Sequence, residues 1–182
     1  PEEGARLLEG MRDFRNAATT LERAIAAQDK AGRSAKTGPL LEMLNSAYFE
    51  TGKDAKRMQT LHRLMAVAPK QSVFKQVANA YEMESAKDPV VMINVYRLGA
   101  SRGLLSSEHY AKYAETALDM SSPGEAVTML EKGMASGAIK KDDRNNRLLA
   151  DARSQVERVK ATLPQQEAEA RAIQAGEPEA KV

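Results

Sequence analysis

The stretch at residues 41–69, LEMLNSAYFETGKDAKRMQTLHRLMAVAP, decides the fold that this sequence predicts. Apolar and small residues recur every three or four positions on both sides of Gly52, which is the spacing of one buried helix face. The first face carries Leu41, Leu44, Ala47 and Tyr48, and the second carries Leu61, Leu64 and Met65. Gly52 can end the first helix because glycine adopts a left-handed backbone without steric cost. The stretch therefore predicts two antiparallel helices, and Pro69 closes the second.

The same pattern returns twice further along the chain. One unit has Phe74, Val77, Ala78 and Tyr81 followed by Met92, Tyr96, Gly99 and Ala100, and the next has Tyr110, Tyr113, Ala114 and Ala117 followed by Ala126, Leu130, Gly133 and Met134. The small residues Ala78, Ala114 and Ala150 are 36 positions apart in each step. A fixed interval between helix pairs indicates repeated units that pack side by side.

These residues resemble the tetratricopeptide repeat, which has a large residue, a small residue, a tyrosine, a turn glycine and a closing proline in this order. The resemblance covers most of residues 4–163 and implies an all-α fold, a right-handed α-α superhelix with a C-terminal capping helix. It divides the chain into a partial or degenerate first unit at 1–29, units at 38–69, 70–105 and 106–140, a capping helix at 141–164 and a polar tail at 165–182. In the first unit we expect one helix to end near Leu8 and a second to span residues 13–25. We expect the tail to be a frayed helix that passes into disorder.

Proline, glycine and short polar residues mark the predicted helix ends. Helices are expected to begin at Gly38-Pro39, Asp88-Pro89 and Ser122-Pro123, and to end at Gly103 and Gly137. Glu125, three residues after Ser122, would complete a capping box. No stretch alternates apolar and polar residues with a period of two, so we expect no sheet.

Composition excludes several classes of function. The 182 residues include 27 basic and 25 acidic side chains, a net charge of +2, which is too balanced to predict nucleic acid or an anionic membrane as the main partner. The absence of cysteine excludes disulfides, zinc-thiolate sites and thiol catalysis. No apolar run approaches the roughly 20 residues of a membrane-spanning helix.

The few residue types that could form a reactive site are scattered. His62 and His109 are the only histidines, and each lacks a nearby second ligand at zinc-like spacing. Asp142 and Asp143 lie where a helix needs an N-cap and favourable charge at its positive end. We therefore expect no catalytic residues, no cofactor and no metal site.

In a helical-repeat array the first helix of each pair lines the concave face, so its exposed side chains point toward a bound partner. Transferring the family's groove positions gives nine candidate partner-binding residues: Glu42, Ser46, Phe49, Lys75, Asn79, Glu82, Glu108, Ala111 and Glu115. Lys75 with Asn79 is similar to half of the family's carboxylate clamp, but neighbouring repeats carry Glu where that clamp requires Lys, Arg or Asn. A mixed, net acidic groove favours a polar or basic peptide, with Phe49 as an apolar anchor.

The sequence thus predicts a non-catalytic scaffold that binds a partner protein or peptide in the concave groove. Two alternatives stay open: an RNA-binding helical repeat, and the scaffold portion of a larger enzyme. Self-association is also open, because residues 143–163 carry an apolar stripe. Residues 95–104 and 130–139 resemble the closing repeats of exported proteobacterial tetratricopeptide proteins, which favours the periplasm over the cytosol. We expect the array to begin in mid-repeat or with a degenerate repeat, and to continue upstream.

Overall fold

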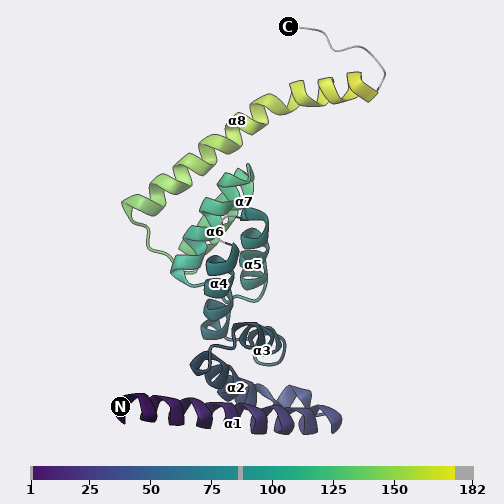
Figure 1. Cartoon of the computed structure of the whole chain (residues 1–182). Helices are drawn as coiled ribbons and strands as arrows, with labels where there is room; N and C mark the ends of the chain where they lie inside the picture. Colours follow the sequence, from purple (N-terminus) through teal and green to yellow (C-terminus); the bar gives the residue numbers. More distant parts are fainter. Residues whose placement is uncertain (1, 86–87, 175–182) are drawn as a thin grey trace. The chain divides into compact units, whose positions relative to one another are not determined.

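The chain is all-α. The computed structural model describes residues 2–85 and 88–174, and within them it contains eight α-helices, one 3-10 turn and no strand. The helices are α1 (Glu2–Lys30), α2 (Gly38–Glu50), α3 (Asp54–Val67), α4 (Gln71–Ser85), α5 (Pro89–Ser101), α6 (Ser107–Asp119), α7 (Pro123–Ala135) and α8 (Asp143–Gln174), and the 3-10 turn spans Ser34–Lys36 (Figure 1). None of these helices is apolar enough over a sufficient length to cross a membrane.

Within each unit, helices that follow one another in sequence also pack against one another. In the unit Pro1–Leu105, each of α1 to α4 contacts the next helix, and in the unit Ser106–Val182, α6 contacts α7 and α7 contacts α8. The fold class is therefore that of an α-α solenoid with a C-terminal helix, built from the hairpins α2–α3, α4–α5 and α6–α7. Below, the term first helices means α2, α4 and α6, which begin the three hairpins, together with α8.

The helix ends follow the local chemistry of the sequence. Gly52, Gly103 and Gly137 adopt positive φ values of 62°, 66° and 71° just after α2, α5 and α7, a conformation that costs glycine nothing. The Asp88 carboxylate accepts hydrogen bonds from the backbone N–H groups of Val90 and Val91, at 3.0 and 3.2 Å, and so caps α5.

The start of α7 differs from the prediction in one respect. Pro123 occupies the first turn as expected, but the Ser122 side chain forms no capping hydrogen bond. The Ser122 backbone N–H donates to the Ala117 carbonyl oxygen at 2.8 Å, and the Glu125 carboxylate accepts a hydrogen bond from the Tyr113 hydroxyl of α6. A tertiary contact to the neighbouring helix has replaced the local capping box.

Two helical glycines allow close packing inside the hairpins. Gly99 on α5 lies against the buried Phe74 ring of α4 and against Leu105, and Gly133 on α7 lies against Tyr110 of α6 and Ile139. The two glycines are 34 residues apart, and each of these two hairpins closes on an aromatic ring that faces a glycine.

The third small residue of the predicted repeat is misplaced by two positions. Ala78 and Ala114 are both 0% exposed, but Ala150 is exposed and Ala152 is the buried residue of α8, at 0%. α4, α6 and α8 begin at Gln71, Ser107 and Asp143, 36 residues apart in each step, so α8 starts at the constant interval but buries a residue two positions further along the helix. The sequence interval alone therefore gave the wrong register for α8.

Both terminal helices are longer than predicted. α1 is one continuous helix of 29 residues rather than two, because a single glycine, Gly10, costs a helix only about 1 kcal/mol. α8 continues through Pro164 to Gln174, so the part of the expected disordered tail at 165–174 is helical. A proline removes one backbone hydrogen bond, and the Glu, Ala, Gln and Arg residues that follow it favour helix. Residues 175–182 lie outside the described residues.

Candidate partner-binding surface

In each of the two units, a hollow opens between two of its first helices. The α2/α4 hollow, in the unit Pro1–Leu105, has a volume of about 220 Å³ and is lined by Glu42, Asn45, Ser46, Leu64, Lys70, Ser72, Val73 and Gln76. The α6/α8 hollow, in the unit Ser106–Val182, has a volume of about 470 Å³ and is lined by Glu115, Asp143, Arg144, Arg147, Leu148 and Asp151. Each hollow thus lies between two neighbouring first helices of one unit.

The α2/α4 hollow has a polar wall. Asn45 is only 7% exposed, and its side-chain amide donates a hydrogen bond to the Gln76 carbonyl oxygen across the two helices at 3.0 Å. The Lys70 ammonium forms an ion pair with Glu42 at 2.5 Å on the rim. The Asn45 Oδ1 atom is buried and has no hydrogen-bond partner among the described residues. A buried acceptor without a partner is costly, but this atom has almost no accessible surface and does not itself offer a contact to a guest.

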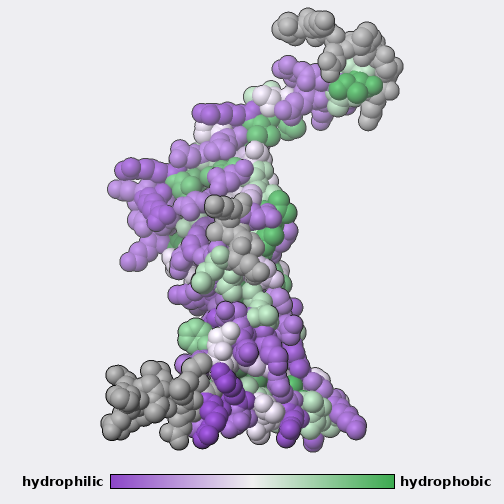
Figure 2. Space-filling model, in the orientation of Figure 1, coloured by the Kyte–Doolittle hydropathy of each residue, from purple (hydrophilic) through white to green (hydrophobic). Residues whose placement is uncertain are grey.

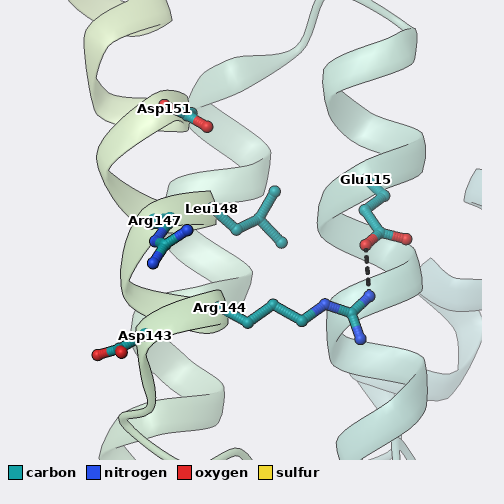
Figure 3. A pocket seen from close by; sticks show the side chains of 6 residues that line it. All are labelled: Glu115, Asp143, Arg144, Arg147, Leu148 and Asp151. Atoms are coloured by element: carbon teal, nitrogen blue, oxygen red, sulfur yellow. Dashed lines mark hydrogen bonds and ion pairs between the residues drawn. The ribbon is translucent and has the colours of Figure 1, made fainter.

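The α6/α8 hollow combines charge with an apolar floor. Figure 3 shows Leu148 pointing from α8 toward α6, while Arg144 crosses to Glu115 at 3.1 Å. Arg147 lies one turn further along α8, between Asp143 and Asp151 in sequence, and it forms no ion pair with any described residue. The hollow therefore offers a guanidinium next to a half-buried leucine.

Three of the nine predicted binding residues line these hollows. Glu42 and Ser46 belong to the α2/α4 hollow, and Glu115 belongs to the α6/α8 hollow. Phe49 lines neither hollow. Its ring is 60% exposed and carries the Arg57 guanidinium 4.8 Å from its centre.

The remaining predicted residues lie outside both hollows. Lys75 and Asn79 are exposed on α4, and Ala111 is half-buried on α6. Glu82 accepts a hydrogen bond from the Tyr96 hydroxyl at 2.9 Å, and Glu108 forms an ion pair with Lys112 at 2.8 Å. The two hollows do not include these five positions.

Three of the acidic residues predicted to bind a partner are paired with bases. Glu42, Glu108 and Glu115 each form an ion pair, with Lys70, Lys112 and Arg144 respectively. Lys70 lies between α3 and α4, Lys112 lies on α6 itself, and Arg144 lies on α8. A count of acidic residues on the first helices therefore misses these bases. The expectation of a net acidic surface is therefore not supported by these pairs.

Sequence reasoning missed Asn45, Gln76, Arg147 and Leu148. One signal was available for Asn45, since it interrupts the apolar stripe of α2 at the point where the later units carry Ala78 and Ala114. A polar residue on a buried face usually has a specific partner. No such signal marked Gln76, Arg147 and Leu148, which line the hollows only because of how the helices pack.

Both histidines make structural contacts. His109 is buried at the start of α6, where its Nδ1 accepts a hydrogen bond from the Ser106 backbone N–H at 3.3 Å and lies 2.9 Å from the Ser106 hydroxyl. The His62 ring stacks on Tyr81 with 6.0 Å between ring centres. Among the residues that the structure describes, no three His, Asp or Glu side chains gather where they could hold a metal ion.

One polar cluster joins α1, α2 and α3. The Lys56 ammonium, hydrogen-bonded to Glu22 at 2.8 Å, lowers the pKa of that carboxyl group, and the Tyr48 hydroxyl, which also donates to Glu22, lowers the pKa further. Burial, followed by the same hydrogen bond, raises the pKa of Tyr48. Because these residues come from α1, α2 and α3, the cluster stabilises the packing of these helices and lines neither hollow.

Comparison with known proteins gives structural neighbours but no family. The sequence matches no protein-family model. No curated protein matches it. Two structures of a kinesin light chain-like protein of Podospora anserina with nearly identical TPR-like repeats are similar to this chain, with TM-scores of 0.41 and 0.40 and identities of 21% and 19%. They cover 96% of this chain and 92% and 93% of their own. The MamA protein gives a TM-score of 0.40 at 15% identity, over 96% of this chain and 98% of its own. These scores are low, and the fold assignment rests on the helices and contacts of this chain.

Proposed function

We propose that this chain is a non-catalytic scaffold that binds a segment of a partner protein in the hollows between its first helices. The observation that carries the proposal is the α6/α8 hollow, where Arg147 and Leu148 stand side by side on a wall with room for a guest side chain. Stacked helical hairpins provide a preformed surface, which lowers the entropy cost of binding an extended segment.

The chemistry of the walls defines the partner. An acidic side chain can pair with Arg147 while an adjacent aliphatic side chain contacts Leu148. The favoured guest is therefore a polar peptide with an acidic residue beside an apolar one, which keeps the polar part of the polar or basic peptide that the sequence suggested.

Selection from a random peptide library, followed by fluorescence polarisation with the enriched peptides, tests the proposal. We expect Arg147→Glu to weaken binding by about tenfold or more, because truncating or reversing a contact at an anchor residue costs about 1–3 kcal/mol. The matched control is Arg158→Glu, which makes the same charge change at an exposed site of α8 outside the hollow. Equal affinities for the two variants would contradict the α6/α8 assignment.

A second pair of variants separates the hollows from the residues predicted by sequence. Asn45→Ala removes the unpartnered acceptor and introduces the residue that the other units carry at this position, so the fold should tolerate it. Phe49→Ala and Lys75→Glu change candidates that lie outside both hollows. If only the latter two weaken binding, the partner uses the exposed faces of α2 and α4 instead. Enrichment of no peptide, together with salt-dependent retention on single-stranded RNA, would favour the RNA-binding alternative.

A further inference from the structure

α8 is much longer than the helix it packs on. It has 32 residues, whereas α2 to α7 have 13 to 15 each. Its first part packs against α7 and buries Ala152 completely. Its second part extends past α6 and α7, and Figure 2 shows apolar atoms in green along it. There Val159 and Leu163 are 43% exposed and Ile173 is 65% exposed.

The apolar residues of α8 follow the spacing of a coiled coil. Alternate steps of three and four residues connect Leu149, Ala152, Val156, Val159, Leu163, Gln166, Ala170 and Ile173. In heptad notation, Leu149, Val156, Leu163 and Ala170 are at position a, and the other four are at position d. This seam repeats every 3.5 residues, so it matches a second helix that supercoils around it. Only the part from Val156 onward is accessible, since α7 covers Ala152.

We propose that residues 156–173, the α8 extension, form an antiparallel coiled coil with the α8 extension of a second copy of this chain. Aligning the two copies so that Val156 faces Ile173 of the second copy uses the whole accessible seam. Val159 then faces Ala170, and Leu163 faces Gln166, each twice by symmetry. The alignment needs no residue that the chain already buries within its own unit.

Charge complementarity selects this orientation. Lys160 and Glu167 are both at position e, and the antiparallel alignment places each Lys160 beside Glu167 of the other copy. A parallel, in-register pair would instead place Gln155 opposite Lys160 and Thr162 opposite Glu167, which gives no opposite-charge pair. Within one chain, Lys160 contacts Glu157 at 2.9 Å, but both side chains are mostly exposed. Exchanging such a surface pair for another costs little, so these charges set orientation more than affinity.

Pro164 and Gln166 are compatible with the pairing. Pro164 is at position b, away from the seam, and the twofold axis falls between residues 164 and 165. The bends that the two prolines introduce therefore occur at the same level of the dimer. Gln166 places one polar side chain in the seam on each side of the axis, and a single polar core residue fixes the register at a cost in stability.

Sedimentation equilibrium of the whole chain tests the proposal directly. We expect the mass to rise from 19.9 kDa toward twice that value at concentrations on the order of 10–100 µM. Leu163→Glu should abolish the increase, since it places a charge in the seam. Ala161→Glu, an exposed site on the opposite face of α8, should not. A constant mass of 19.9 kDa across this range would overturn the proposal and would leave a helix of another protein as the occupant.

Cysteine cross-linking determines the orientation, because the native chain has no cysteine. A mixture of Val156→Cys and Ile173→Cys chains should form a mixed disulfide dimer under mild oxidation, and neither variant alone should cross-link efficiently. Efficient cross-linking of Val156→Cys alone would indicate a parallel pair and overturn the antiparallel assignment. Neither measurement depends on the peptide binding proposed above, so the two proposals can fail separately.

Discussion

Replacing Gly99 by alanine should destabilise the α4–α5 hairpin, although the same change stabilises most helices. A Cβ atom at Gly99 would lie 2.4 and 2.6 Å from two ring atoms of Phe74 and 2.7 Å from a methyl group of Leu105. Carbon atoms pack comfortably at about 3.5–4.0 Å, so the ring would have to move by about 1 Å. Phe74 is fully buried, which leaves no free space for that movement.

The magnitude follows from two opposing effects. Overpacking a buried site costs about 1–3 kcal/mol, and the higher helix propensity of alanine returns about 1 kcal/mol. Because three contacts are shorter than any normal packing distance, we take the upper part of the first range and expect a net loss of about 1–2 kcal/mol. Gly133→Ala, with its closest contacts at 3.0 Å, should lose less. Gly124→Ala, with no atom within 4 Å, should be neutral or stabilising by up to about 1 kcal/mol.

Urea denaturation followed by circular dichroism at 222 nm gives the free energy of unfolding of each variant. Repeat units can unfold in separate steps, so amide hydrogen exchange in α4 and α5 should accompany it. The packing explanation predicts the order Gly124→Ala, Gly133→Ala, Gly99→Ala from most to least stable. A Gly99→Ala chain as stable as the Gly124→Ala chain, with unchanged protection in α4 and α5, would refute it.

Three further predictions concern the N-terminal cap of α5, the register of α8 and the ion pair of Glu22. Asp88→Ala removes the acceptor that caps α5 and should cost about 1 kcal/mol in the same urea assay. Ala152→Asp buries an unpaired carboxylate and should cost at least about 3 kcal/mol of stability. Ala150→Asp changes the exposed face of α8 and should alter the stability by no more than about 0.5 kcal/mol. The reverse order of the two variants would support the register expected from sequence. The lowered pKa of Glu22 means that its ion pair stabilises the fold near neutral pH and that this contribution is lost as the pH falls through the lowered value. Between about pH 7 and pH 3, Glu22→Gln should therefore lose less stability than the native chain, by under about 1 kcal/mol because the pair with Lys56 is partly exposed.

The order and type of the helices could be predicted because they depend on short-range chemistry. Apolar spacing on either side of Gly52 and the Asp88-Pro89 start of α5 act within one or two helical turns. The register of α8 could not be predicted in the same way. α8 begins 36 residues after α6, as α6 begins 36 residues after α4, so the offset comes from which face of α8 packs on α7, and neither Ala150 nor Ala152 carries a local signal for that rotation.

The candidate surface was less predictable because its contacts join distant residues. Asn45 meets Gln76 across 31 positions, and Glu115 meets Arg144 across 29. The repeat pattern identified the helices whose faces form the surface, and so included Glu42, Ser46 and Glu115. It could not identify the partners, since those are fixed by the rotation of one helix against the next and by the side-chain rotamers.

α8 is long enough for two roles: its first part covers α7, as expected of the predicted capping helix, and its second part exposes apolar residues to a second helix. Covering α7, a helix of 13 residues, requires a helix of similar length, and α8 satisfies this by about Val156. A helix that only caps an array turns a polar face to solvent beyond that point. In α8 the three-and-four spacing instead continues through Val159, Leu163 and Ile173, whose side chains are exposed. A second helix that covers these residues explains why the apolar spacing continues beyond the part of α8 that packs on α7. Truncating the chain after residue 157 should then remove self-association while α7 stays covered.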